Sequence, residues 1–243
     1  MMYMKKLTKK ARKQIEKDYG AFSAHIISYI DEMLYIRNQL EKAICYKHEG
    51  KMDGMISLST SPLLNKYCML RRNNPLTICA DCFSVSLNEI RGTLKEKLKR
   101  NTVLLTDRIY PISFFPILNV RFFRLESFGD LNNEVQLINY FRLCEANTDV
   151  SFSLWTKNLF ILRSVRKLGY KKPKNLIILF SSPIKNREIT IDLDPWIDKY
   201  FTVFTKDYVK AHGIKINCGK LHCLTCLKCY KHNRIKFIRE LLK

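Results

Sequence analysis

Hydrophobic positions along the chain follow two different spacings. Between residues 7 and 47, apolar side chains recur every three or four positions, which predicts one or two amphipathic helices. The members of this apolar face are Phe22, Ile26, Ile27, Ile30, Met33, Leu34, Ile36, Leu40 and Ile44. Because the face is so complete, we favour a packed helical extension over a free basic arm that binds nucleic acid. Residues 85–99 predict a further helix.

The second half of the chain alternates between extended and helical patterns. Extended segments are predicted at 120–126, 150–155, 176–180 and 200–205, and helices at 133–146 and 159–168. Strands that alternate with helices indicate a parallel sheet with right-handed crossovers. We therefore expect an α/β fold, a partial (β/α) barrel at 51–210, with an N-terminal helical extension at 1–50 and a cysteine-rich metal-binding segment at 211–243.

Small and polar residues follow each predicted strand. These strand ends are 127–130, 156–158, 181–183, 205–207 and 217–219. Parallel strands bring their carboxyl ends to one edge of the sheet, where such folds bind ligands. We expect Lys157 to hold an anionic group there, and Ser181, Ser182 and Asn217 to donate hydrogen bonds.

The charge of the chain favours anionic partners. Lys and Arg number 43 against 22 Asp and Glu, a net charge of +21, which attracts nucleic acid or an anionic nucleotide cofactor. Many lysines lie beside Asn and Ile, as in proteins from AT-rich genomes, so the charge alone does not establish such a partner. No apolar run is long enough for a membrane span or a signal peptide, and we expect the protein in the cytoplasm.

Cysteine spacing is the strongest chemical signal in the sequence. The chain has nine cysteines, and in a reducing cytoplasm close spacing indicates metal or redox chemistry rather than disulfides. Four of them, Cys218, Cys223, Cys226 and Cys229, include a CxxCxxC run, which is typical of iron-sulfur loops although zinc would also accept four thiolates. We expect no ligand role for the isolated Cys45 and Cys144.

An earlier group contains Cys68, Cys79 and Cys82. Three thiolates either take a fourth ligand from elsewhere, such as Cys218, or leave an open coordination position, which catalytic metals keep. Alternatively, Cys79 and Cys82 join Cys226 and Cys229 in a single structural zinc site without catalysis.

Several short strings resemble a known family. They are SLSTS at 57–61, Asn74-Pro75 before CADCF at 79–83, FRLESFGDL at 123–131, LWTKN at 154–158, PKNL at 173–176, SSP at 181–183 and the cysteine run at 218–229. From about residue 55 onward, the chain resembles the bacteriophage "gene product eighty-eight" family, and more distantly phage proteins with a radical S-adenosylmethionine layout.

This resemblance implies a phage source, hence the host cell cytoplasm, and one or two 4Fe-4S clusters. It also implies that the segment with Ser127, Gly129 and Asp130 binds the amino group of S-adenosylmethionine, with Glu126 or Asp130 as acceptor. An equally weighted alternative is that residues 129–132 only turn the chain and cap the next helix.

Two functions follow as hypotheses. The first is a radical S-adenosylmethionine-like iron-sulfur enzyme that acts on an unknown substrate, nucleotide or nucleic acid among the candidates. The second is a zinc-stabilised protein that binds nucleic acid or a host factor without catalysis. An electron-transfer or redox-sensing protein is a weaker third hypothesis.

Overall fold

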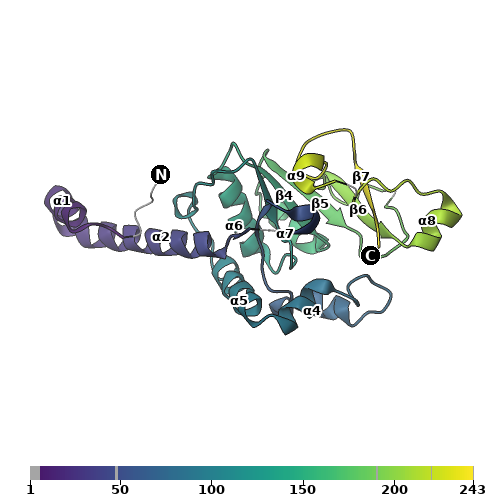
Figure 1. The fold of residues 1–243 in the computed structure, drawn as a ribbon. Helices are drawn as coiled ribbons and strands as arrows, with labels where there is room; N and C mark the ends of the chain where they lie inside the picture. Colours follow the sequence, from purple (N-terminus) through teal and green to yellow (C-terminus); the bar gives the residue numbers. More distant parts are fainter. Residues whose placement is uncertain (1–5, 47–48, 190, 220, 243) are drawn as a thin grey trace.

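A single mixed sheet organises the protein. The structure is a computed structural model, and it describes residues 6–46, 49–189, 191–219 and 221–242. Seven strands lie in the order of the chain (Figure 1). They are β1 (Cys45–Tyr46), β2 (Ile56–Leu58), β3 (Phe122–Leu125), β4 (Ser151–Thr156), β5 (Leu176–Ser181), β6 (Lys199–Phe204) and β7 (Phe237–Leu241). β1 runs antiparallel to β2, and every later pair is parallel. Parallel strands added in chain order are the arrangement of a barrel that has not closed, so the predicted α/β partial barrel is confirmed.

Helices connect most of these strands. The α-helices are α1 (Lys9–Tyr19), α2 (Ser23–Ala43), α3 (Lys66–Arg72), α4 (Phe83–Ile90), α5 (Gly92–Thr106), α6 (Glu134–Glu145), α7 (Leu159–Lys167), α8 (Lys206–His212) and α9 (Cys223–Cys226). Short 3-10 turns lie at η1 (Gly20–Phe22), η2 (Gly50–Met52), η3 (Pro62–Leu64) and η4 (Ile112–Phe114). Two predicted helices occur as α6 and α7. The predicted helix at 85–99 is instead divided between α4 and α5, because Arg91 has an extended backbone (φ −101°, ψ 94°) just before Gly92.

The two faces of the sheet differ in what covers them. Side chains such as Phe123, Leu125 and Phe152 face α6 and α7, where they pack against a large buried apolar cluster. Burying one such side chain contributes about 1.5–3 kcal/mol. The opposite, inner face carries a smaller cluster with Leu179 and Phe201. Cys218 and Cys229 pack against this second cluster, so the C-terminal cysteine segment covers part of the inner face.

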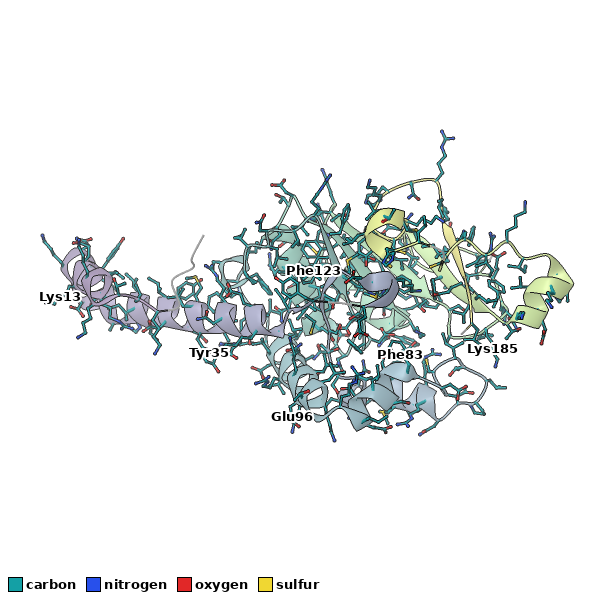
Figure 2. All side chains as sticks on the ribbon, in the orientation of Figure 1. Lys13, Tyr35, Phe83, Glu96, Phe123 and Lys185 are labelled. Atoms are coloured by element: carbon teal, nitrogen blue, oxygen red, sulfur yellow. The ribbon has the colours of Figure 1, made fainter. Side chains whose placement is uncertain are left out.

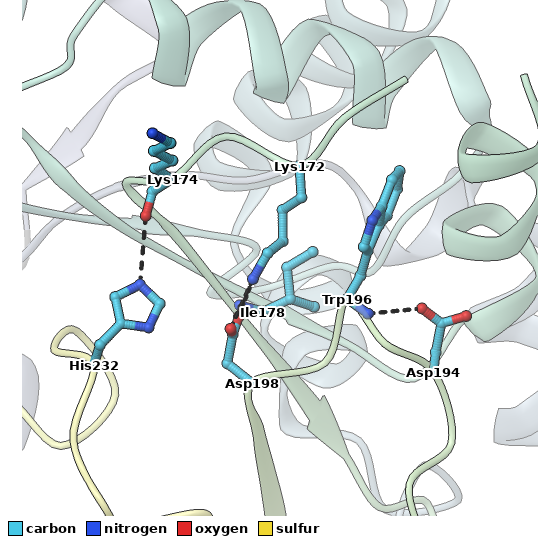
Figure 3. A network of polar contacts seen from close by, with 7 residues as sticks. All are labelled: Lys172, Lys174, Ile178, Asp194, Trp196, Asp198 and His232. Atoms are coloured by element: carbon cyan, nitrogen blue, oxygen red, sulfur yellow. Dashed lines mark hydrogen bonds and ion pairs between the residues drawn. The ribbon is translucent and has the colours of Figure 1, made fainter. Parts of the chain in front are cut away.

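The connection between β5 and β6 contains no helix among its described residues, and carboxylates hold it in place. Asp198 accepts hydrogen bonds from the Lys172 ammonium (2.6 and 2.7 Å) and from the Ile178 backbone N–H (2.8 Å) (Figure 3). The buried Asp194 accepts from the Trp196 N–H (3.0 Å) and forms an ion pair with Arg166 (3.2 Å). These contacts fix the start of β6 against β5.

The N-terminal extension packs only in part, which corrects the expectation from sequence. Leu34, Ile36, Leu40 and Ala43 in the second half of α2 are buried, whereas α1 buries no residue. Figure 1 shows α2 leading away from the body with α1 at its far end. Residues 1–5 and 47–48 of the expected extension lie outside the described residues.

Two parallel strands were missing from the sequence prediction. β2 is three residues long and runs directly into the polar stretch 59–61, so its sequence resembles a loop although all three residues are buried. β7 comes from the segment 211–243, which we expected to be only a metal loop, and it pairs with β6 along five residues. Within the described residues, none of the helices combines the length and the apolar character that a bilayer span requires.

Candidate metal and ligand site

The first cysteine group lies at the carboxyl edge of the parallel strands. Cys68 is in α3, and Cys79 and Cys82 lie in the loop that precedes α4, so all three follow β2. Asn65 fixes this segment, since its side chain accepts from the Cys68 N–H (3.3 Å) and donates to the backbone oxygen of Asp130 (2.8 Å), beyond the end of β3.

The same loop also contacts the ends of the next two strands. The Tyr67 hydroxyl donates to the Lys157 carbonyl beyond β4 (2.5 Å), and the Ile78 N–H donates to the Pro183 carbonyl beyond β5 (2.8 Å). The segment from Asn65 to Cys82 therefore follows β2 and is hydrogen-bonded just beyond the ends of β3, β4 and β5.

Charged groups surround these thiols. Burial raises the pKa of Cys68 and of Cys79, the carboxylate of Asp130 raises both further, and the Lys157 ammonium lowers both. The positive charge of Lys157 thus acts on two of the three thiols. In the part of the chain that the structure describes, no three Cys, His, Asp or Glu side chains already converge at metal-binding distance.

Glu126 is a buried carboxylate at the end of β3. Its side-chain oxygens accept hydrogen bonds from Gln136 Nε2 (2.6 Å), Thr60 Oγ1 (3.0 Å), the Thr60 N–H (3.3 Å) and the Tyr140 hydroxyl. Burial raises the pKa of Glu126 to about 7, although the hydrogen bonds from Tyr140 and Thr60 lower it. Its backbone is in the left-handed region (φ 55°), which is uncommon for a residue with a side chain.

Gly129 is needed because the chain passes close to this carboxylate. An added Cβ would lie 2.7 Å from Glu126 Oε2 and 2.7 Å from the Thr60 carbonyl oxygen. A side chain at this position would push β2 and β3 apart at their carboxyl ends.

Asp130 connects the end of β3 to the end of β4. Its buried carboxylate accepts from the Lys157 N–H (2.9 Å), the Leu131 N–H (2.8 Å) and the Thr156 hydroxyl. The cap of α6 is Asn133, whose side chain accepts from the Gln136 N–H. The capping role that we considered for residues 129–132 therefore belongs to the next residue.

The other candidate ligand residues lie in two places. Ser127 shares hydroxyl hydrogen bonds with Ser59 (3.0 Å) and Ser57 (3.2 Å) at the ends of β2 and β3. Ser181 and Ser182 are buried at the end of β5. Asn217 lies elsewhere, since its side chain bonds the backbone of Phe237 and Arg239 in β7. The sequence prediction that Asn217 marks a strand end at the same edge is therefore wrong, because no strand of the described chain ends just before it.

The second cysteine group surrounds a small cavity. Cys218, Cys223, Cys226 and Cys229 all line a cavity of about 20 Å³, roughly the space that one water or one ion needs. Burial raises the pKa of Cys229 to about 12, and the Arg124 guanidinium lowers it.

This second group also bridges distant parts of the chain. Lys51 and Glu240 form an ion pair beside it. An added Cβ on Gly54, whose φ is 73°, would lie 2.9 Å from the side chain of Leu224. The C-terminal cysteine loop, residues 218–229, therefore contacts the segment that leads into β2 as well as β7.

The sequence prediction missed the contact between Arg124 and Trp155 on the inner face. The guanidinium of Arg124 lies 4.3 Å from the ring centre of Trp155, and the charge of Arg124 lowers the pKa of Cys223 as well as that of Cys229. Alternation along β3 places Arg124 opposite to Phe123 and Leu125. That alternation could have been used to find it once the strand was known.

The two cysteine groups are separate. In Figure 1, α9, which contains Cys226, lies above the strands, and α4, which directly follows Cys82, lies below them. Different charged groups shift the pKa values of the two sets of thiols. They are Asp130 and Lys157 for the first set, and Arg124, Lys51 and Glu240 for the second. The structure thus does not bring Cys79 and Cys82 together with Cys226 and Cys229.

These features define an open (β/α) barrel protein with one cysteine group at the carboxyl edge of its strands and another on its inner face. A family model, Gene product 88, matches residues 42–240. The chain belongs to the Gene product 88 family. No curated protein and no solved structure matches it. The family match begins near the end of α2 and leaves out α1 and nearly all of α2.

Proposed function

We propose that this protein is a metal-thiolate protein and, more specifically, a radical S-adenosylmethionine-like iron-sulfur enzyme. The observation that supports the proposal best is the position of Cys68, Cys79 and Cys82. They follow the first parallel strand and lie at the carboxyl edge, where (β/α) barrels bind ligands and carry out chemistry. Three thiols without a fourth cysteine in the group suit a cluster that keeps one open iron.

The residues at the edge fit an anionic cofactor or substrate. A cluster held by the three thiols would supply one-electron chemistry to a bound sulfonium group. The charge of the Lys157 ammonium lowers the pKa of Cys68 and of Cys79, so it would offset thiolate charge or hold a carboxylate or phosphate of the ligand. The hydroxyls of Ser127, Ser59 and Ser57 are hydrogen-bonded to one another at the same edge.

We propose for Glu126 and Asp130 a different role from the one that the resemblance implies. Both carboxylates are buried and accept from the protein's own donors. We therefore propose that they position the strand ends around the site.

The C-terminal group supports a second candidate function. Four thiols line one cavity of about 20 Å³, and four thiolates that converge on a single centre there are a suitable ligand set for a tetrahedral zinc ion. In that case the metal would staple the loop to the inner face, and the protein would act by binding nucleic acid rather than by catalysis.

Metal and acid-labile sulfide analysis, with a visible spectrum on protein purified without oxygen, tests both proposals. About seven or eight irons with equal sulfide indicate two clusters, about four indicate one, and zinc without sulfide overturns the iron-sulfur proposal. Calorimetric titration with S-adenosylmethionine then decides between an enzyme of this class and an electron carrier. The Cys82→Ala variant should lose iron from the edge site, with Cys144→Ala as the matched control.

A further inference from the structure

The N-terminal arm, defined as α1, η1 and the start of α2 up to Ser28, is a surface that the body of this chain does not cover. α1 and η1 bury no residue, and the buried residues of α2 begin only at Leu34. The arm joins the body at Tyr29, whose ring lies 5.3 Å from that of Phe114. The arm contributes little to the stability of the core because it buries so little of its surface, so we looked for its role in binding a partner.

The charge of the arm is concentrated on α1. Residues 5–17 contain seven basic residues (Lys5, Lys6, Lys9, Lys10, Arg12, Lys13 and Lys17) and one acidic residue, Glu16. Arg12 is used internally, because it pairs with Asp31 (2.5 Å) and fastens α1 to α2. The four lysines of α1 are all exposed, and Figure 2 shows Lys13 at the outer end of the arm.

Three of the four nearby acidic groups are engaged by other residues, and the fourth, Glu16, is exposed on α1. Asp18 accepts from Gln14 (2.8 and 2.9 Å), Asp31 pairs with Arg12, and Glu32 pairs with Arg108. Lys9, Lys13 and Lys17 are spaced four residues apart, so they form one stripe about 12 Å long. Duplex DNA presents about seven phosphate charges over that length when both strands are counted.

Aromatic side chains lie exposed beside this stripe. Tyr19 and Phe22, at the junction of α1 and α2, are 56% and 71% exposed. An apolar ring next to lysines is poorly placed in water, whereas nucleic acids offer bases on which it can stack. Charge and aromatic exposure together are the combination expected at a nucleic-acid surface.

We propose that the arm binds nucleic acid, with Lys9, Lys13 and Lys17 on phosphates and with Phe22 against a base. This proposal does not depend on metal in the cysteine groups, and it accounts for the projection of the arm from the body. It also adds to the family domain, because the Gene product 88 match begins at residue 42.

The test compares salt dependence in the full chain. Binding to a fluorescein-labelled duplex DNA, and to a single strand of the same length, is followed by anisotropy from about 50 to 200 mM salt. Each phosphate contact contributes about 0.9 to the slope for duplex DNA, so the variant Lys9→Gln/Lys13→Gln/Lys17→Gln should have a slope lower by about 2.7. The wild type should then lose about 40-fold more affinity than this variant over that range.

A matched variant removes the same charge elsewhere. Lys95→Gln/Lys99→Gln/Lys167→Gln changes three exposed lysines of α5 and α7 and should leave the slope within about 0.5 of wild type. Equal slopes for the wild type and the arm variant, or equal losses in both variants, overturn the proposal.

Two further measurements distinguish base stacking and self-association from phosphate binding. Phe22→Ala should weaken single-strand binding by about 5-fold or more with the salt slope unchanged; no change removes the base contact from the proposal. Sedimentation velocity shows whether the arm variant alters self-association instead, which would overturn the proposal in favour of a second copy of the chain. Metal analysis of the same samples shows whether the metal proposal holds, whatever the binding result.

Discussion

The ionisation of Glu126 gives the sharpest prediction about the site. Its pKa is about 7 in the folded protein, against about 4.3 for an unperturbed glutamate. The folded chain therefore binds more protons than the unfolded chain between these two values. The contribution of Glu126 to the free energy of unfolding is therefore fully present below the pKa of the unfolded chain, and it is lost as pH rises through the pKa of the folded chain.

The size of the effect follows from this shift. Between about pH 5.5 and pH 8, the free energy of unfolding should fall by about 2 kcal/mol because of Glu126 alone. Glu126→Gln removes the titration while keeping an oxygen that accepts from Tyr140 and Gln136. We expect the difference in free energy of unfolding between wild type and Glu126→Gln to change by about 2 kcal/mol over this range.

Urea denaturation at a series of pH values measures this difference directly. Glu96→Gln is the control, because Glu96 is exposed on α5 and its loss should leave the pH dependence unchanged. If the free energy of unfolding changes with pH in the same way for the wild type and for Glu126→Gln, the raised pKa of Glu126 is refuted. Metal content has to be equal in all samples, so that metal loss is not mistaken for titration.

Three further predictions concern the two cysteine groups and the strand ends. Cys226→Ala should release metal and weaken the C-terminal loop, whereas Cys144→Ala should do neither by metal analysis; equal content in both contradicts the ligand assignment. Asp130→Asn should lower the free energy of unfolding by about 1.5–3 kcal/mol with metal retained, by urea denaturation. A variant that keeps full stability but loses cofactor binding would instead make Asp130 a ligand. Gly129→Ala should destabilise by about 1–3 kcal/mol through overpacking against Glu126, again by denaturation, and a neutral result excludes that close approach.

Much of the fold could be predicted because alternating segments are long and regular. β5 has a continuous apolar run, β4 and β6 combine apolar residues with a few polar ones, and α7, which follows β4, has clear amphipathic spacing. β2 could not be predicted because three residues carry too little pattern. β7 could not, because Phe237–Leu241 includes the charged Arg239 and Glu240, which an edge strand tolerates.

The site was predictable where it depends on topology and not where it depends on contacts. Strand ends placed Ser127, Asp130 and Lys157 near one another because all parallel strands end at one edge. Sequence could not show that Asp130 is engaged by Lys157 and Thr156, since these contacts depend on the backbone path beyond the strands. Asn217 was misplaced for a related reason, because its turn lies beside a strand that comes later in the chain.

The contact between the segment before β2 and β7, beside the C-terminal cysteine loop, also affects how the protein folds. The ion pair between Lys51 and Glu240 spans 189 positions of the sequence, so it belongs to the most non-local contacts of the fold. Strands β3 to β6 pair with their neighbours in the chain and can assemble early, whereas this contact must wait for the loop to find the opposite side of the sheet. A metal ion bound by the four thiols would order the loop on its own, and would thereby shorten the search that completes the inner face.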